Sequence, residues 1–226
     1  MESNSNFKAA IFDLDGLILD TETVSFMGWK RAMADFGYRL DDDTYHKIIG
    51  LNIPDMKQVF YDTFGTDFPL EKICQKRLTY IYEHIDSYGI KIKPGLCEIL
   101  DFLDKAGLLK AVATSSSIES AKRKLTVTAL LDRFDYLVCG DQVKKSKPSP
   151  DIFLDVAAHL KVLPKDCLVF EDSENGVRAA HAADMTVIMV PDVKQPTPEI
   201  ADLACKIFNS LKEALPFVQN LLSPDM

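Results

Sequence analysis

Short runs of consecutive apolar residues recur along this chain, separated by longer stretches in which apolar residues follow helical spacing. The runs are continuous rather than alternating, which is typical of strands buried on both faces of a parallel sheet. They cover residues 8–13, 110–114, 136–140, 167–171 and 186–190, with a weaker one at 206–209.

The stretches between these runs carry helix signals. Apolar residues repeat at intervals of three and four over residues 96–103 and 152–160, and Gly107 follows the first of these stretches as a helix stop. Ser173 is a candidate N-cap for a further helix. Strands that alternate with helices predict an α/β fold with a doubly wound, mostly parallel, Rossmann-like sheet.

One long segment interrupts this alternation directly after the first strand. Residues 20–90 contain no strand-like run, and they show helical patterns at 22–36, 54–64 and 69–88. We therefore predict two domains: an α/β core formed by residues 1–19 and 91–226, and an all-helical cap formed by residues 20–90.

Composition limits the possible partners. With 47% hydrophobic and 27% charged residues among 226, the chain can build a core, which argues against general disorder. The net charge of −8 argues against nucleic acid or an anionic membrane as the main partner, but it permits a small phosphorylated molecule. We find no signal peptide, no membrane span, no coiled-coil heptads and no long apolar surface stripe, so we expect a monomer.

The five cysteines are odd in number and widely spaced, and they form no C-x-x-C pair. Cys139, Cys167 and Cys205 lie in or beside apolar runs, so we expect reduced, buried thiols. This pattern favours a cytoplasmic protein over a disulfide framework or a zinc site.

The first candidate site follows the first strand. Asp13 and Asp15 are two residues apart and would share a face of an extended chain, while Gly16 permits a sharp turn. With Asp20 they form an acidic group that would repel itself unless a hard divalent cation were present. The alternative is a loop with acidic helix caps, and on this stretch alone both interpretations stay open.

A second acidic site, Glu171-Asp172-Ser173, follows another apolar run. On its own, it is better explained by Asp172 and Ser173 capping the next helix. In an open α/β sheet, however, the carboxyl ends of the strands meet at the ligand crevice. Two acidic strand ends together therefore favour a metal site.

Two further strand ends carry anion-binding groups. Thr114 and Ser115 begin a run of hydroxyls before a helix, although an ordinary serine N-cap explains this run better when it is taken alone. Lys147 is held extended by Pro148, and the alternative there is a solvated basic loop. Acids with a metal, hydroxyl donors and a lysine are together suited to phosphoryl transfer through an aspartyl phosphate.

With these motifs in place, the chain resembles the haloacid dehalogenase superfamily of phosphotransferases, in the branch with a helical cap inserted after the first motif. The residues that carry the resemblance occur in the family's order and span nearly the whole chain: FDLDGLILDT at 12–21, Thr114, Lys147 in KPSPDIF, and Glu171-Asp172 in FEDSENG.

This resemblance implies a role for each motif. Asp13 is the nucleophile, and Asp15 is the general acid and then the general base. Thr114, Ser115 and Lys147 bind the transferred phosphoryl group, and Mg²⁺ is held by Asp13, Asp15 (through its carbonyl), Asp172 and, in an assisting role, Glu171.

The resemblance extends to sugar-phosphate phosphatases, pseudouridine 5′-phosphatases and β-phosphoglucomutases. The mutase pattern carries a His and a cap-loop Arg where this chain has Ser25 and Ile53, which favours hydrolysis of a small phosphorylated metabolite and leaves a mutase as the alternative. A non-catalytic signalling module with a phosphorylated Asp is the alternative from another class. The candidate substrate-selecting residues lie in the cap, and they are Glu22, Gly50, Leu51 and Asn52.

Overall fold

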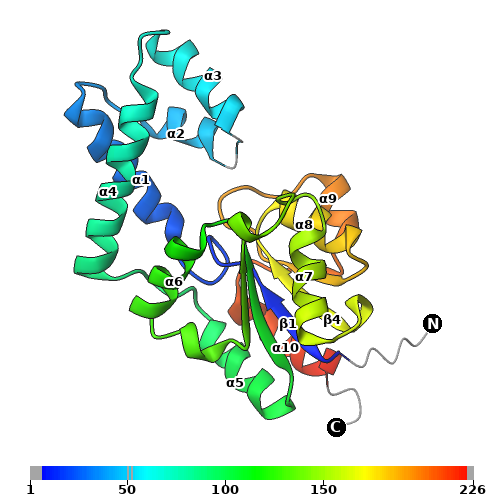
Figure 1. Ribbon diagram of the computed structural model, residues 1–226. Coiled ribbons are helices and arrows are strands. Elements are labelled where there is room, and N and C mark those ends of the chain that lie inside the picture. The colour runs from blue at the N-terminus through cyan, green and yellow to red at the C-terminus, as the bar shows by residue number, and fades with distance from the viewer. Residues whose placement is uncertain (1–6, 50, 52, 223–226) are drawn as a thin grey trace. The chain divides into compact units, whose positions relative to one another are not determined.

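A computed structural model describes residues 7–49, 51 and 53–222 of the chain. The chain divides into two compact units, one formed by residues 1–20 and 91–226 and the other by residues 21–90. We call them the core unit and the helical unit (Figure 1).

The core unit is built on a parallel sheet of six strands in the order β3-β2-β1-β4-β5-β6. The α/β prediction is confirmed, and a strand overlaps each apolar run. The central strand β1 has β2 on one side and β4 on the other, so the direction of winding changes there. The strands are β1 (Ala9–Phe12), β2 (Leu109–Thr114), β3 (Tyr136–Cys139), β4 (Cys167–Glu171), β5 (Thr186–Met189) and β6 (Lys206–Ile207).

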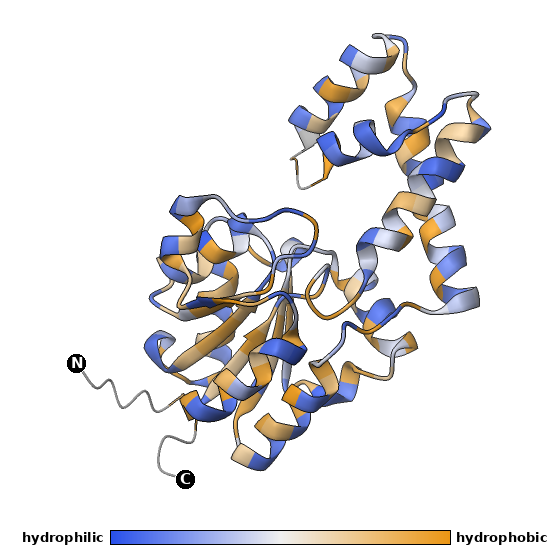
Figure 2. Cartoon of the chain, turned by 180° about the vertical axis from the view of Figure 1, so that it is seen from behind, coloured by the Kyte–Doolittle hydropathy of each residue, from blue (hydrophilic) through white to orange (hydrophobic). Residues whose placement is uncertain are grey.

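Helices cover both faces of this sheet (Figure 1). Alternate strand residues such as Ile11 and Val169 pack with α7 and α8 in one continuous apolar cluster. On the other side α5 packs against α10 and β2. The strands are hydrophobic over most of their length, whereas the helices carry both polar and apolar residues (Figure 2). The helices are α5 (Leu96–Ala106), α6 (Ile118–Val127), α7 (Asp151–Leu160), α8 (Glu174–Ala182), α9 (Pro198–Leu203) and α10 (Leu211–Leu222), with 3₁₀ turns at Leu131–Arg133, Gly140–Gln142 and Pro164–Asp166.

The described residues of the helical unit form helices and loops, without a strand, as the sequence predicted. Gly28 lets the first and last helices approach closely, because a Cβ there would lie 2.8 Å from Cγ1 of Ile81. Aromatic rings fill the interior, and Trp29 and Phe60 have centroids 5.0 Å apart. The helices are α1 (Thr21–Asp35), α2 (Asp42–Ile48), α3 (Ile53–Phe64) and α4 (Leu70–Tyr88).

Helix α2 was not predicted, because it is short and mostly polar. It begins at a local signal, since the Asp41 side chain accepts a hydrogen bond of 2.7 Å from the backbone N–H of Thr44.

The cysteine prediction needs one correction. All five thiols are free, and Cys139 and Cys167 are buried, but Cys205 is exposed. Cys205 precedes β6, a two-residue strand at the edge of the sheet, where few residues remain to cover it. No helix in the described part of the chain is long and apolar enough to cross a membrane.

Candidate active site

The predicted site residues of the core unit gather at the carboxyl edge of the sheet, around the end of β1. The register pairs Phe12 with Val112 on β2 and with Phe170 on β4. The backbone N–H of Asp13 continues this ladder by donating to the carbonyl of Phe170 at 3.1 Å. Asp13 therefore lies between the end of β2, which carries Thr114, and the end of β4.

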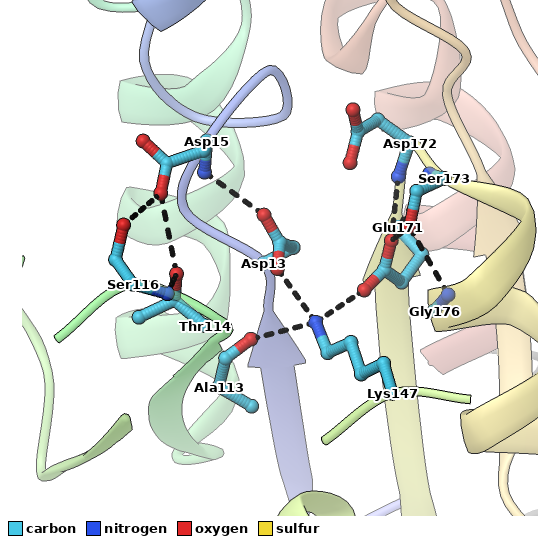
Figure 3. A network of polar contacts seen from close by, with 10 residues as sticks. All are labelled: Asp13, Asp15, Ala113, Thr114, Ser116, Lys147, Glu171, Asp172, Ser173 and Gly176. Carbon is cyan, nitrogen blue, oxygen red and sulfur yellow. Dashed lines mark hydrogen bonds and ion pairs between the residues drawn. The ribbon is translucent and has the colours of Figure 1, made fainter. Parts of the chain in front are cut away.

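Lys147 links the ends of three strands (Figure 3). Its Nζ donates to Oδ1 of Asp13 at 2.6 Å, to Oε1 of Glu171 at 2.5 Å and to the carbonyl of Ala113 at 2.9 Å. Burial lowers the pKa of this lysine, but the two carboxylates more than offset that effect, so its pKa lies above the usual value. Lys147 is therefore a fixed, buried cation beside Asp13.

Glu171 is completely buried, and protein donors engage both of its oxygens. Besides the bond from Lys147 to Oε1, its Oε2 accepts hydrogen bonds from the backbone N–H groups of Asp172 and Ser173 and from the Ser173 hydroxyl, at 3.0 to 3.1 Å. The Ser173 hydroxyl in turn caps α8 by accepting from the N–H of Gly176. Any larger residue than glycine at position 176 would collide with the Glu171 carboxyl, because a Cβ there would lie 1.8 Å from its Cδ. Glu171 thus orders Lys147 and the turn before α8.

In contrast to the fully hydrogen-bonded Glu171, the carboxyl groups of Asp13 and Asp172 have raised pKa values. Burial, and then the charges of Glu171 and Asp15, raise the pKa of Asp13 to about 7 although Lys147 opposes the shift. Burial and the neighbouring Asp13 and Glu171 also raise the pKa of Asp172 well above its usual range. These two carboxyl groups are therefore poorly compensated in their ionised forms.

The turn after β1 brings its backbone against Asp172. Gly16 has a φ of +88°, and a Cβ there would lie 2.4 Å from Oδ2 of Asp172 and 3.1 Å from Oδ2 of Asp192. The sequence predicted a turn at Gly16 but not the approach of Asp192, whose charge is paired with Lys93 at 2.6 Å. Only glycine fits this place without displacing Asp172.

Asp15 turns its carboxylate away from Asp13 and toward the loop after β2 (Figure 3). Its backbone N–H donates to Oδ2 of Asp13 at 2.8 Å, while its own Oδ2 accepts from Ser116 at 2.7 Å and from Thr114 at 3.3 Å. Its Oδ1 accepts from Lys124 at 2.6 Å. Burial raises the pKa of Asp15, but Lys124 and the hydroxyl donors outweigh that effect, and the pKa is lowered.

Ser116 and Lys124 belong to this site but were not predicted from the sequence. Ser116 lies in the hydroxyl run that was singled out, and the next residue of that run, Ser117, is the N-cap of α6, as the alternative interpretation held. The side chain of Ser115, which was predicted to bind phosphate, is exposed. Lys124 could have been found from helical spacing, because it lies beside the buried Leu125 and one turn after the buried Ala121.

The negative charge of the carboxylates suits a divalent cation, but their side chains are not already arranged around a metal position. Across the described residues, no group of three or more acidic, histidine or cysteine side chains is arranged to hold a metal ion. The reason is that Asp15 and Glu171 turn toward lysines. The site holds four carboxylates and two lysines, which leaves an excess of two negative charges when all six groups are ionised. The carboxylates are those of Asp13, Asp15, Glu171 and Asp172, and the lysines are Lys124 and Lys147.

The candidate substrate-selecting residues lie in the helical unit. Gly50 and Asn52 are outside the described residues. Leu51 is partly buried, and its N–H donates to the carbonyl of Ile48 at 3.2 Å. Glu22, near the start of α1, accepts a hydrogen bond from the hydroxyl of Tyr45.

A polar cluster around Glu22 was not foreseen from the sequence. The Tyr45 hydroxyl also lies 3.1 Å from Oγ of Ser25, which accepts a hydrogen bond of 2.8 Å from Nη2 of Arg77. The Arg77 guanidinium lies 4.8 Å from the ring centroid of Trp29. Within the described part of the chain, Nε of Arg77 is buried without a hydrogen-bond partner.

Comparison with known proteins places the chain in a family. The family model of haloacid dehalogenase-like hydrolases matches residues 10–190. The chain is 34% identical to a phosphorylated carbohydrates phosphatase of Thermotoga maritima over 78% of this chain and 81% of that one. It is 31% identical to a probable pseudouridine-5′-phosphatase of Drosophila melanogaster over 91% and 90% of the two chains. The crystal structure of a putative β-phosphoglucomutase from Thermotoga maritima matches with a TM-score of 0.81 at 28% identity, over 94% of this chain and 99% of that one. The chain belongs to the haloacid dehalogenase-like hydrolase family.

Proposed function

We propose that this protein is a Mg²⁺-dependent phosphatase that hydrolyses a small phosphorylated metabolite, such as a sugar phosphate or a nucleoside 5′-phosphate. The observation that carries the proposal is the buried Asp13 carboxylate, oriented by Lys147 at 2.6 Å and by the N–H of Asp15 at 2.8 Å. A carboxylate fixed in this way beside a cation is suited to nucleophilic attack on phosphorus.

The reaction has two half-reactions. In the first, an oxygen of Asp13 attacks phosphorus, the bond to the leaving alcohol breaks, and Asp15 donates a proton to that alcohol. Because the effect of burial is outweighed by Lys124, the pKa of Asp15 is lowered in the free protein, and Asp15 would take up this proton when the negative charge of the substrate binds beside it. In the second, Asp15 takes a proton from water, whose oxygen attacks the phosphorus of the aspartyl phosphate. The bond between phosphorus and the Asp13 oxygen breaks, which releases inorganic phosphate and regenerates the Asp13 carboxylate. Thr114, Ser115 and Lys147 would bind the transferred phosphoryl group.

Mg²⁺ would be held by the carboxylates of Asp13 and Asp172 and by the backbone carbonyl of Asp15. When bound, it neutralises negative charge on both the attacking carboxylate and the phosphate. Glu171 would assist through Lys147 and through the backbone of Asp172, because protein donors already occupy its oxygens.

The remaining expectations belong to the same proposal. The helical unit would act as a cap, with Glu22, Gly50, Leu51 and Asn52 selecting the substrate. We expect a monomeric cytoplasmic enzyme without nucleic-acid or membrane partners, and the net charge of −8 supports the last point.

The test is release of inorganic phosphate from p-nitrophenyl phosphate and from a panel of sugar phosphates and nucleoside monophosphates. We expect many turnovers per protein with Mg²⁺, none in excess chelator, and recovery when Mg²⁺ is restored. A single phosphorylation event without turnover would instead support the signalling module. Full activity in excess chelator would rule out the metal assignment.

A mutase is the second candidate, and one observation now favours it more than the sequence did. The mutase pattern has a cationic or proton-donating His where this chain has Ser25, and Arg77 places a guanidinium on that serine at 2.8 Å. The helical unit therefore holds a cation at this position by another route, although Ile53 still replaces the cap-loop Arg of the pattern.

The two candidates differ in where the phosphoryl group goes. We expect hydrolysis, with stoichiometric phosphate release and no need for a bisphosphate activator. The assay supplies β-glucose 1-phosphate with trace glucose 1,6-bisphosphate. Rapid formation of glucose 6-phosphate with little free phosphate would establish the mutase instead.

A further inference from the structure

Lys124 is a buried cation to which neither the family motifs nor the proposed mechanism gives a role. It lies in α6 and is 7% exposed, whereas the neighbouring Lys122 of the same helix is exposed. A lysine is almost never buried unless its charge is paired, because desolvating an unpaired ammonium group is costly. The contacts of Lys124 must therefore explain its burial.

These contacts all lead to Asp15. Nζ of Lys124 donates to Oδ1 of Asp15 at 2.6 Å and lies 3.1 Å from Oγ of Ser116. The Ser116 hydroxyl in turn donates to Oδ2 of Asp15 at 2.7 Å. Lysine, serine and aspartate thus close a triangle in which both carboxylate oxygens have a fixed donor.

This arrangement gives each aspartate of the D-x-D pair its own lysine. Lys147 reaches Asp13 from the loop before α7, and Lys124 reaches Asp15 from α6. The two carboxylates face different partners: that of Asp13 lies between Lys147 and the N–H of Asp15, and that of Asp15 points toward the loop after β2 (Figure 3). The orientation of Asp15 is therefore determined by side chains outside the D-x-D motif.

We propose that Lys124 is a positioning residue for Asp15, which together with Ser116 fixes the direction of the carboxylate that transfers the proton to the leaving alcohol. The inference rests on the proposed function, in which Asp15 makes that transfer. A misplaced proton donor loses much of its effect, because general acid catalysis requires hydrogen-bond geometry at the reacting atom.

A positioning role for Lys124 can be distinguished from a phosphoryl-binding role by comparing substrates whose leaving groups do and do not need a proton. The ratio kcat/KM covers all steps up to departure of the leaving alcohol. The p-nitrophenolate anion leaves without a proton, whereas a sugar alkoxide needs one. Loss of a positioning residue for the acid therefore slows alkyl phosphates selectively, whereas loss of a phosphate ligand slows both substrates.

The experiment measures kcat/KM of wild type, Lys124→Met, Lys124→Arg and the matched control Lys122→Met. The substrates are p-nitrophenyl phosphate and the faster of glucose 6-phosphate and uridine 5′-monophosphate. For Lys124→Met we expect a loss of at least about tenfold on the alkyl phosphate and less than about threefold on p-nitrophenyl phosphate. Lys124→Arg should recover most of the loss, because it keeps a cation within reach, and Lys122→Met should match wild type.

Equal losses on both substrates, or no loss on either, would overturn the inference while leaving the phosphatase proposal intact. A wild-type protein that hydrolyses neither substrate would refute the proposed function itself. If circular dichroism shows that Lys124→Met does not fold, Ser116→Ala removes the other side of the triangle and should give the same selective loss. An unselective effect of Ser116→Ala would count against the inference in the same way.

Discussion

Each unit of the molecule contains a buried polar cluster, and the two clusters differ in how their charges are balanced. In the core unit, four carboxylates share the edge of the sheet with two lysines, and burial raises the pKa of Asp13 to about 7. In the helical unit, the carboxylate of Glu22 and the guanidinium of Arg77 are linked through Ser25 and Tyr45. The first cluster carries an excess of negative charge, and the second pairs one charge of each sign.

This difference separates a cluster that needs an added cation from one whose opposite charges balance each other. A buried group of like charges costs free energy until a cation joins it, so the core cluster is suited to binding Mg²⁺ and a phosphate. A cluster with one charge of each sign stabilises the packing around it without an added cation.

Removing the nucleophile should have the largest effect. Asp13→Asn keeps the shape of the side chain but removes its anionic oxygen, so we expect phosphatase turnover to fall by on the order of 10³-fold or more. The matched control in the other cluster is Glu22→Gln, which also replaces a carboxylate by its amide and should cost far less. Both are measured as phosphate release under saturating Mg²⁺. If Asp13→Asn kept a tenth of wild-type activity, Asp13 would not be the nucleophile.

The excess negative charge should also lower the stability of the metal-free protein as the pH rises. The pKa of Asp13 is about 7 in the folded protein, against an ordinary value of 3.8, so its contribution to stability is full below about pH 4 and is lost as the pH rises through 7. Asp172 shifts in the same direction, whereas the lowered pKa of Asp15 matters only in more acidic solution. We expect urea unfolding in excess chelator to show a free energy lower at pH 8.5 than at pH 5.5, by on the order of a few kcal/mol.

The variant Asp13→Asn tests the origin of this pH dependence. It removes the titrating group, so it should be more stable than wild type at pH 8.5 in chelator and should reduce the difference between the two pH values. Mg²⁺ should stabilise the wild type at pH 8.5 by mass action. Equal stability of the wild type at both pH values would contradict the charge excess inferred for the core cluster.

The metal affinity should depend on Asp172. Asp172→Ala removes a carboxylate that the proposed function assigns to Mg²⁺, so we expect the Mg²⁺ concentration for half-maximal activity to rise by at least about tenfold. Asp192→Ala is the control, because this neighbouring carboxylate is paired with Lys93. An unchanged Mg²⁺ requirement in Asp172→Ala would exclude that carboxylate as a ligand.

The sequence predicted more of the core cluster than of the helical one, for a physical reason. Four of its residues stand at or after the carboxyl end of a buried strand, and parallel strands bring their carboxyl ends to one edge of the sheet. These residues are Asp13, Thr114, Lys147 and Glu171. The spacing along the chain and the sheet topology together are therefore enough to bring them together. The direction in which Asp15 turns was not predictable, because it depends on Lys124, a single position of a helix.

The helical cluster left no comparable signal in the sequence. Tyr45 lies in α2, a helix of seven residues, and Arg77 lies in α4, 52 residues from its partner Ser25. No periodic pattern encodes which faces of three helices meet, since that depends on packing such as the close approach at Gly28. The sequence consequently identified Glu22 as a candidate but gave no indication of the residues around it.

The smallest predicted effect concerns the helical cluster and tests its structural role. Burial and the neighbouring Glu22 raise the pKa of Tyr45 above its usual value, so the phenol stays protonated and keeps its hydrogen bond to that carboxylate. Tyr45→Phe removes the donor and leaves Glu22 without this bond in a half-buried place. We expect the free energy of unfolding to fall by about 1–2 kcal/mol, which is the usual cost of deleting one partner of a buried hydrogen bond.

A second tyrosine in the same unit provides the control for this measurement. The Tyr80 hydroxyl donates to Asp35 at 2.5 Å in an exposed position, so Tyr80→Phe should change stability by no more than about 0.5 kcal/mol. Urea unfolding followed by fluorescence of Trp29 reports on this unit, because it is the only tryptophan of the chain. If Tyr45→Phe instead left stability unchanged and reduced p-nitrophenyl phosphate turnover as strongly as Asp13→Asn, the balanced cluster would be part of the chemistry. The contrast between the two units would then have to be abandoned.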